Sequence, residues 1–319
     1  MTMRPIARYA WGLLAYQVAV IAWGAYVRAT GSGAGCGQHW PLCKGEVVPR
    51  SPSVATIVEL SHRASSGVAF VLTLALLAWA VRAYPSGHRV RRGAGATVVL
   101  MTSEAVIGAG LVLLKLVAHD ASLQRAVGTS LHLVNTFLLL AATSLTAWWA
   151  SGGDPVRLRG RGLVVPALTL CLSATLLVAT SGALTALGDT LFPASSLATG
   201  LAQDMAAGAS PYVRLRAIHP MLAGATAALV LVTMASVRAL RAARTVNILS
   251  RAAGGLAVAQ VAVGLLDITL LAPVAMQLVH LLLADLVWIG LVLTSAAVLA
   301  SAPEEVSRAG YPPSHPLLG

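Results

Sequence analysis

Long runs of apolar residues, separated by short breaks rich in Arg, Gly or Pro, dominate the chain. A helix that crosses a bilayer needs about 20 apolar residues, and eight runs approach or exceed this length. The first run follows Arg4 and Arg8, as in a signal peptide, but its length favours an uncleaved first span. We expect transmembrane helices at about residues 9–28, 57–81, 94–117, 125–150, 162–187, 212–237, 246–271 and 275–300.

The composition supports a membrane protein. Charged residues make up 10% of the 319 residues and hydrophobic residues 57%, whereas soluble domains have roughly 25% charged residues. A net charge of +11 would suggest nucleic-acid binding in a soluble protein, but most arginines fall in alternate loops. The positive-inside rule places these loops and both termini in the cytoplasm. We expect a multi-pass protein of the cell (inner or plasma) membrane that contacts the lipid bilayer and no nucleic acid.

The chain contains an internal repeat. Residues 59–67 (ELSHRASSG) align with residues 216–224 (RAIHPMLAG), and residues 104–108 (EAVIG) align with residues 260–264 (QVAVG). The fourth and eighth predicted helices each add one histidine. Because each repeat holds four spans, both enter the membrane from the same side and are related by an axis along its normal.

The predicted fold is therefore an all-α integral membrane protein with eight transmembrane helices in two parallel-repeat four-helix bundles. The bundles comprise residues 1–150 and 151–300. Residues 301–319 contain several prolines and few apolar residues, so we expect a disordered cytoplasmic tail.

Four histidines fall at matching depth, five to seven residues after the predicted starts of their helices: His62, His132, His219 and His280. A single histidine in a membrane helix is commonly a packing residue, whereas four at repeat positions favour metal ligation. Each half supplies two imidazoles without the further ligands of a closed zinc site, which suits haem iron. Arg216, one turn before His219, is placed to meet haem propionates, or alternatively to reach the membrane surface.

Glu59 occupies the position equivalent to Arg216, on the same helix face as His62. A carboxylate within a membrane helix is costly and indicates function; the alternative is an ion pair with Arg63, four residues on. If the acid is functional, the first half performs chemistry that needs a proton acceptor or a stabilised cation. The second half would then hold a permanent haem.

The three cysteines divide into two groups. Cys171 lies within a predicted span and is expected to be a core residue. Cys36 and Cys43 lie in the first outer loop, where thiols can oxidise and a disulfide is sterically possible. A structural staple and a redox role are both compatible with this pair.

Residues 26–45 (YVRATGSGAGCGQHWPLCKG), followed by ELSHR at 59–63, resemble the haem A synthase family, in particular its bacterial type with a cysteine pair in the first outer loop. Residues 180–193 (TSGALTALGDTLFP) and 218–220 (IHP) match the second half of that family. The resemblance extends over nearly the whole chain.

The resemblance implies an oxidoreductase that converts haem O into haem A for terminal oxidases. It oxidises the C8 methyl group to a formyl group by successive hydroxylations, with water as the oxygen source. In such enzymes His219 and His280 would ligate a resident haem b, while His62 and His132 would surround the substrate haem O and Glu59 would be required for activity. Expected partners are a haem O synthase (protohaem farnesyltransferase) and an unidentified electron acceptor.

Some alternatives remain open at this point. A multihaem b-type electron carrier and a quinone-linked thiol oxidoreductase would also use membrane histidines and an outer cysteine pair, but neither needs the Glu59 asymmetry. A parallel-repeat transporter would place polar residues nearer the bilayer midplane. The chain also departs from its own repeat at Glu104, which stands where the second half has Gln260.

Overall fold

The computed structural model describes residues 4–240 and 243–300. These residues form helices and loops without a β-strand, apart from one isolated β-bridge between Cys43 and Glu46. The α-helices in the described part are α1 (Pro5–Ala29), α2 (Val54–Ala83), α3 (Arg89–Leu113), α4 (Leu123–Ala150), α5 (Val164–Leu191), α6 (Leu197–Met205), α7 (Pro211–Leu240), α8 (Arg244–Thr269) and α9 (Val274–Ala300), with one short 3-10 helix, η1 (Ser32–Ala34).

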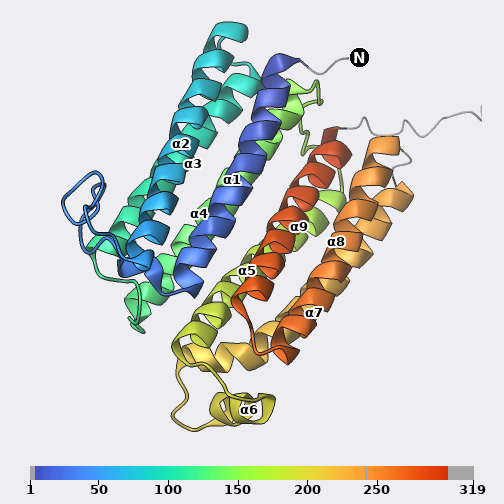
Figure 1. Ribbon diagram of the computed structural model, residues 1–319. Helices are drawn as coiled ribbons and strands as arrows, with labels where there is room; N and C mark the ends of the chain where they lie inside the picture. The colour runs from blue at the N-terminus through green and yellow to red at the C-terminus, as the bar shows by residue number, and fades with distance from the viewer. Residues whose placement is uncertain (1–3, 241–242, 301–319) are drawn as a thin grey trace, which may run out of the picture.

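Eight of these helices, all except α6, are long and apolar enough to cross a membrane. The prediction of an all-α multi-pass membrane protein with eight spans is therefore confirmed. Pro5 and Ala300 lie at the same end of the bundle (Figure 1), as an even number of spans requires. The predicted tail, residues 301–319, lies outside the described residues.

Two helices end earlier than predicted, by four residues and by two residues. The helix expected to reach residue 117 ends at Leu113, and Lys115 then adopts a positive φ of 63°. The helix expected to reach residue 271 ends at Thr269, and Leu271 follows with a φ of 62°. A residue with left-handed backbone ends a helix, and that residue is usually glycine. Here Lys115 and Leu271 adopt this conformation within apolar runs, so the sequence contained no glycine to mark the helix ends.

Serine caps fix the starts of the two first-half helices that carry histidines. The hydroxyl oxygen of Ser53 accepts the backbone N–H of Thr56 at the start of α2, and that of Ser122 accepts the N–H of Arg125 at the start of α4, each at 3.2 Å. Such caps satisfy N–H groups that have no partner within the helix. They therefore help to set the depth of His62 and His132.

The helices pack in two groups of four that lie side by side (Figure 1). Helices α1 to α4 share one buried core, which includes Leu13 and Leu76, and helices α5 and α7 to α9 share another, which includes Leu168 and Val298. The groups meet where Phe137 of α4 packs against Trp288 of α9, whose indole N–H donates to the Phe137 carbonyl at 2.6 Å. Whether the groups are parallel repeats stays a prediction.

Most spans expose a broad apolar face. In α2, α3, α5, α7 and α8 only 17–22% of the most apolar window is buried within the protein, against 61% in α9. Apolar side chains that point outward belong in the lipid of a membrane protein. Helix α9, which carries His280, is therefore the most enclosed span among the described residues.

The short helix α6 was not predicted. Its cap is reciprocal, because the Ser196 hydroxyl accepts the Thr199 N–H while the Thr199 hydroxyl accepts the Ser196 N–H. A capping box of this kind is a local start signal for a helix. Helix α6 packs against α7 at the end of the bundle opposite the N-terminus (Figure 1).

Candidate functional site

The four predicted histidines lie at one end of the bundle, on α2, α4, α7 and α9. Each lies six to nine residues after the first residue of its helix. At 1.5 Å per residue this corresponds to a depth of about 9–14 Å. The common depth expected from the sequence is thus retained, slightly deeper than predicted because most of these helices begin earlier.

The second-half histidines face one another. The ring centres of His219 and His280 are 6.5 Å apart and the ring planes are nearly perpendicular, at 87°. The Nδ1 atom of His219 is 2.9 Å from the Ser181 hydroxyl, and the Nε2 atom of His280 is 3.2 Å from the side-chain amide of Gln260. The remaining ring nitrogen of His280, Nδ1, is buried without a hydrogen-bond partner.

His132, in the first half, has a different neighbour, an acid. The Nδ1 atom of His132 lies 3.3 Å from Glu104, although the two are not aligned as a hydrogen bond. The carboxylate of Glu104 accepts hydrogen bonds from Asn135 and Thr136, each at 2.5 Å. His62 has no such partner, and its Nδ1 atom is buried and unpaired.

Sequence reasoning noted Glu104 but missed Asn135 and Thr136. Both lie one turn after His132 on α4, so their spacing from a histidine was the available signal. Their partners on α3 could not be known before the helices were packed.

Glu59 connects helix α2 to the loop between α1 and α2, and only 3% of its surface is exposed. One oxygen accepts the backbone N–H of Cys36 at 2.8 Å, and the other accepts the guanidinium of Arg63 at 2.5 Å. The ion pair with Arg63, considered from the sequence, is therefore present. Arg63 also donates to the carbonyls of His39 and Leu42, at 2.6 and 2.7 Å, so it fastens the same loop.

Cys36 and Cys43 form a disulfide, which agrees with the sequence-based expectation. Both cysteines are completely buried. Gly35 packs tightly on the start of α2, where an added Cβ would collide with the Ala55 carbonyl, and its own carbonyl accepts the Thr56 hydroxyl at 2.8 Å. The disulfide loop is thus a compact cover on α2. Cys171 is buried and unbonded to another cysteine, as expected.

Arg216 is already surrounded by partners. Its guanidinium donates to Asp204 of α6 at 2.9 Å, to Gln203 at 3.0 Å and to the Phe192 carbonyl at 3.1 Å, and it lies 3.4 Å from Asp189 of α5. The residue therefore ties α7 to α6 and α5. A contact with haem propionates stays a prediction, and it would have to be made by the donor hydrogens that remain.

Arg28 is a residue that the sequence reasoning missed. It lies at the end of α1, yet it donates to the Ala186 carbonyl at 2.8 Å, to Thr190 of α5 at 3.1 Å and to Gln277 of α9 at 2.8 Å. An arginine at the end of an apolar run is a weak signal for such contacts. Arg28 joins the two halves at the level of the histidines.

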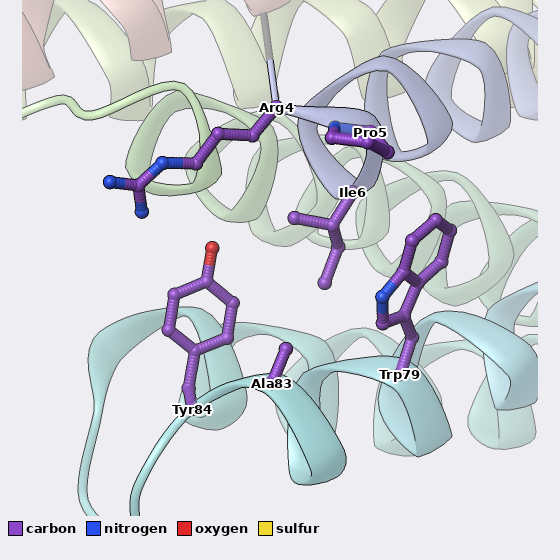
Figure 2. Close-up of a pocket in the computed structure, with 6 residues that line it drawn as sticks. All are labelled: Arg4, Pro5, Ile6, Trp79, Ala83 and Tyr84. Atoms are coloured by element: carbon purple, nitrogen blue, oxygen red, sulfur yellow. The ribbon is translucent and has the colours of Figure 1, made fainter.

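The opposite end of the bundle contains a separate pocket, between the start of α1 and the end of α2. Figure 2 shows the guanidinium of Arg4 near the hydroxyl of Tyr84, with Ile6 and Ala83 between them and the indole of Trp79. Basic and aromatic side chains of this kind typically lie at a membrane surface. The pocket is remote from the histidines and brings no further group to them.

The residue clusters limit the kind of metal centre. Among residues 4–240 and 243–300, no three His, Cys, Asp or Glu side chains gather in a way that could hold a metal ion. In the second half, His219 and His280 face one another as a pair of imidazoles. This arrangement therefore suits a metal-containing group whose iron is bound by two facing imidazoles.

Comparison with known proteins gives a family match over most of the chain. Residues 7–292 match the family model COX15-CtaA, described as cytochrome oxidase assembly protein. Two proteins of Thermus thermophilus strains, both named protoheme IX farnesyltransferase, are 48% identical over 301 residues, 94% of this chain and 50% of theirs. The chain thus spans about half the length of these relatives.

Other relatives match a shorter stretch. A protein named heme A synthase from Exiguobacterium sibiricum is 36% identical over 126 residues, 40% of this chain and 41% of its own. Another heme A synthase, from Alkalihalophilus pseudofirmus, is 41% identical over 93 residues, 29% of this chain and 31% of its own.

Proposed function

This chain belongs to the COX15-CtaA family of cytochrome oxidase assembly proteins, and from that premise we propose that it is a haem A synthase, which oxidises haem O to haem A. The relatives named heme A synthase support this reading, as does the family resemblance of the cysteine loop. The observation that carries the proposal is the pair of facing imidazoles, His219 and His280, on helices α7 and α9.

The second-half residues fit a resident haem b. Two imidazoles that share one iron ion have ring centres roughly 6 Å apart, because each metal–nitrogen bond is about 2 Å. His219 and His280 are 6.5 Å apart. Ser181 contacts Nδ1 of His219, so Nε2 remains for iron. A hydrogen-bonded second nitrogen is the usual way to fix the orientation of a histidine ligand. When bound, this haem would accept electrons one at a time.

The first-half residues fit the substrate. The half with His62 and His132 carries two acids: Glu59 lies one turn before His62 on α2, and Glu104 lies 3.3 Å from Nδ1 of His132. The second half has Arg216 and Gln260 at the matching positions. We assign haem O to the half with the two acids.

The reaction needs a site for protons. Conversion of a methyl group to a hydroxymethyl group consumes one water and releases two electrons and two protons. A second such step gives a geminal diol, which loses water to leave the formyl group. Each oxygen of Glu59 accepts one N–H and keeps a lone pair free. The carboxylate can therefore take a proton from the attacking water or stabilise positive charge on the substrate.

A haem O synthase is the proposed supplier of the substrate. The Thermus thermophilus relatives named protoheme IX farnesyltransferase are about twice as long as the stretch that matches this chain. We assign the activity in their name to their unmatched half, which would place the two consecutive activities in one polypeptide there. For this chain, the proposal places it in the cell membrane with cytoplasmic termini and an external electron acceptor.

The test is to express the chain in cells supplied with haem O, purify it in detergent and separate the extracted haems by chromatography. A formyl haem is expected from the wild type. Haem b alone would favour an electron carrier and overturn the proposal. In parallel, the chain is given haem b and farnesyl diphosphate without haem O; formation of haem O would show that the farnesyltransferase name applies to this half.

A further inference from the structure

Each of the four histidine rings lies against a glycine of a neighbouring helix. The structure repeats this contact in both halves, although the sequence analysis did not identify it. The pairs are Gly24 of α1 with His62, Gly108 of α3 with His132, Gly182 of α5 with His219, and Gly264 of α8 with His280.

Three of the contacts leave no room for a larger side chain. A Cβ atom placed on Gly24, Gly182 or Gly264 would lie 2.8 Å from the Cε1 atom of the facing ring. Carbon atoms in contact are normally about 3.5–4.0 Å apart. A Cβ atom on Gly108 would lie 3.7 Å from Cε1 of His132, an ordinary contact. Three rings therefore pack directly against the backbone of a neighbouring helix, which we call seated, whereas the fourth ring, His132, has room to move.

The backbone does not require glycine at these positions. All four lie within helices, and none is among the described residues with a positive φ. Inside a helix glycine is less favourable than alanine. At Gly24, Gly182 and Gly264 the facing ring explains the glycine, because any larger side chain there would collide with the imidazole and displace it.

We propose that Gly24, Gly182 and Gly264 are positioning residues that set the place of a histidine ligand, and that His132, which lacks this restraint, is the ligand that moves when the substrate haem is exchanged. The proposal rests on the proposed function, because it takes the histidines as haem ligands. Both second-half rings are seated, as suits a permanent cofactor. In the first half only His62 is seated, as suits an occupant that enters and leaves.

An alanine at these glycines should move the ring rather than unfold the protein. The colliding atoms belong to the end of a flexible side chain, which can turn away. The chain offers matched controls on the same helices: a Cβ on Gly12 of α1 or on Gly255 of α8 would meet nothing within 4 Å. G12A is thus the control for G24A, and G255A is the control for G264A.

The resident site is tested by optical spectra and haem content of the purified holoprotein. We expect G182A and G264A to shift the haem absorption bands or to lower haem content at least fivefold, whereas G255A leaves both unchanged. Normal spectra and content in G182A and G264A would overturn the positioning role.

The substrate site is tested by titrating haem O into protein that retains its resident haem. We expect the apparent affinity to fall at least tenfold in G24A and less than twofold in G108A and G12A. An equal loss in G24A and G108A would overturn the assignment of His132 as the mobile ligand.

A readout without haem separates this inference from the proposed function. If the wild type bound no tetrapyrrole, the proposed function would fail, yet the seating of the rings could still be measured on the same protein. Thermal unfolding should then show lower midpoints for G24A, G182A and G264A, and unchanged or higher midpoints for G12A and G255A. Equal midpoints in both sets would overturn the ring contacts themselves.

Discussion

The carboxylate of Glu59 accepts the backbone N–H of Cys36 at 2.8 Å. This single bond joins the acid on α2 to the disulfide loop, across 23 positions of sequence. Because the second oxygen of Glu59 binds Arg63, which in turn holds the loop carbonyls, the acid and the loop form one connected unit. A substitution in the acid should therefore change the structure of the loop, and a substitution in the loop should change the position of the acid.

Replacement of Glu59 by Gln should abolish haem A formation, by at least 100-fold, while the resident haem spectrum stays unchanged. The amide keeps the shape of the side chain and can still accept the N–H of Cys36, but it carries no charge and is a poor proton acceptor. Extraction and chromatography of haems from the variant measure the outcome. Normal production of haem A by E59Q would remove the acid from the mechanism.

Replacement of Arg63 by Ala should expose the disulfide. Cys36 and Cys43 are completely buried, and Arg63 holds the loop by two carbonyls. We expect reduction by a small phosphine reductant, followed by thiol labelling, to be at least tenfold faster in R63A. Arg50 lies exposed in the same loop, so R50A is the control and should react like the wild type. Equal rates for R63A and R50A would show that the arginine does not hold the loop closed.

Replacement of both cysteines by Ser separates a structural from a redox role. Complete burial of the disulfide favours a structural role, because exchange with an external thiol needs access to sulfur. We expect the double variant C36S/C43S to unfold at a lower temperature and to keep haem A formation in proportion to the protein that remains folded. Loss of activity in fully folded protein would instead support an electron relay.

Replacement of Arg28 by Met should loosen the contact between the halves. The variant loses three hydrogen bonds from a charged donor, each typically worth about 1.5–3 kcal/mol, so the free energy of unfolding should fall by at least the value of one such bond. Arg8 is exposed on the same helix, and R8M should leave stability unchanged. Denaturant unfolding in detergent measures both. A wild-type stability in R28M would mean that packing alone holds the halves together.

Replacement of Glu104 by Gln introduces the residue that the second half has at the equivalent position, Gln260. One carboxylate oxygen accepts a hydrogen bond from Asn135 and the other accepts one from Thr136, whereas the amide has a single oxygen and places an NH2 group at the second position. We expect a lower thermal midpoint and weaker binding of haem O, with an unaltered resident haem spectrum. A change confined to the resident haem would contradict the assignment of Glu104 to the substrate half.

The sequence was sufficient to predict the eight spans, because uninterrupted apolar runs are a strong local signal. It also predicted the common level of the four histidines, since residue counts along parallel helices convert directly to depth. The ion pair of Glu59 with Arg63 followed from their spacing of four residues on one helix. These are properties of single helices.

Other features depend on how helices pack and could not be predicted from the sequence. The three partners of Arg28 lie on α5 and α9, far along the chain. The glycine beside each ring lies on a different helix from its histidine, so no spacing pattern reveals the contact. The ends of α3 and α8 were misplaced because residues other than glycine adopt the left-handed backbone there.

The hydrogen bond from Trp288 to the Phe137 carbonyl joins the helix of His280 directly to the helix of His132. The two haem sites proposed for this protein would therefore lie on helices that already pack directly against each other. Electron transfer between haems held at these two sites would need no movement of one half toward the other, so its rate should not depend on solvent viscosity.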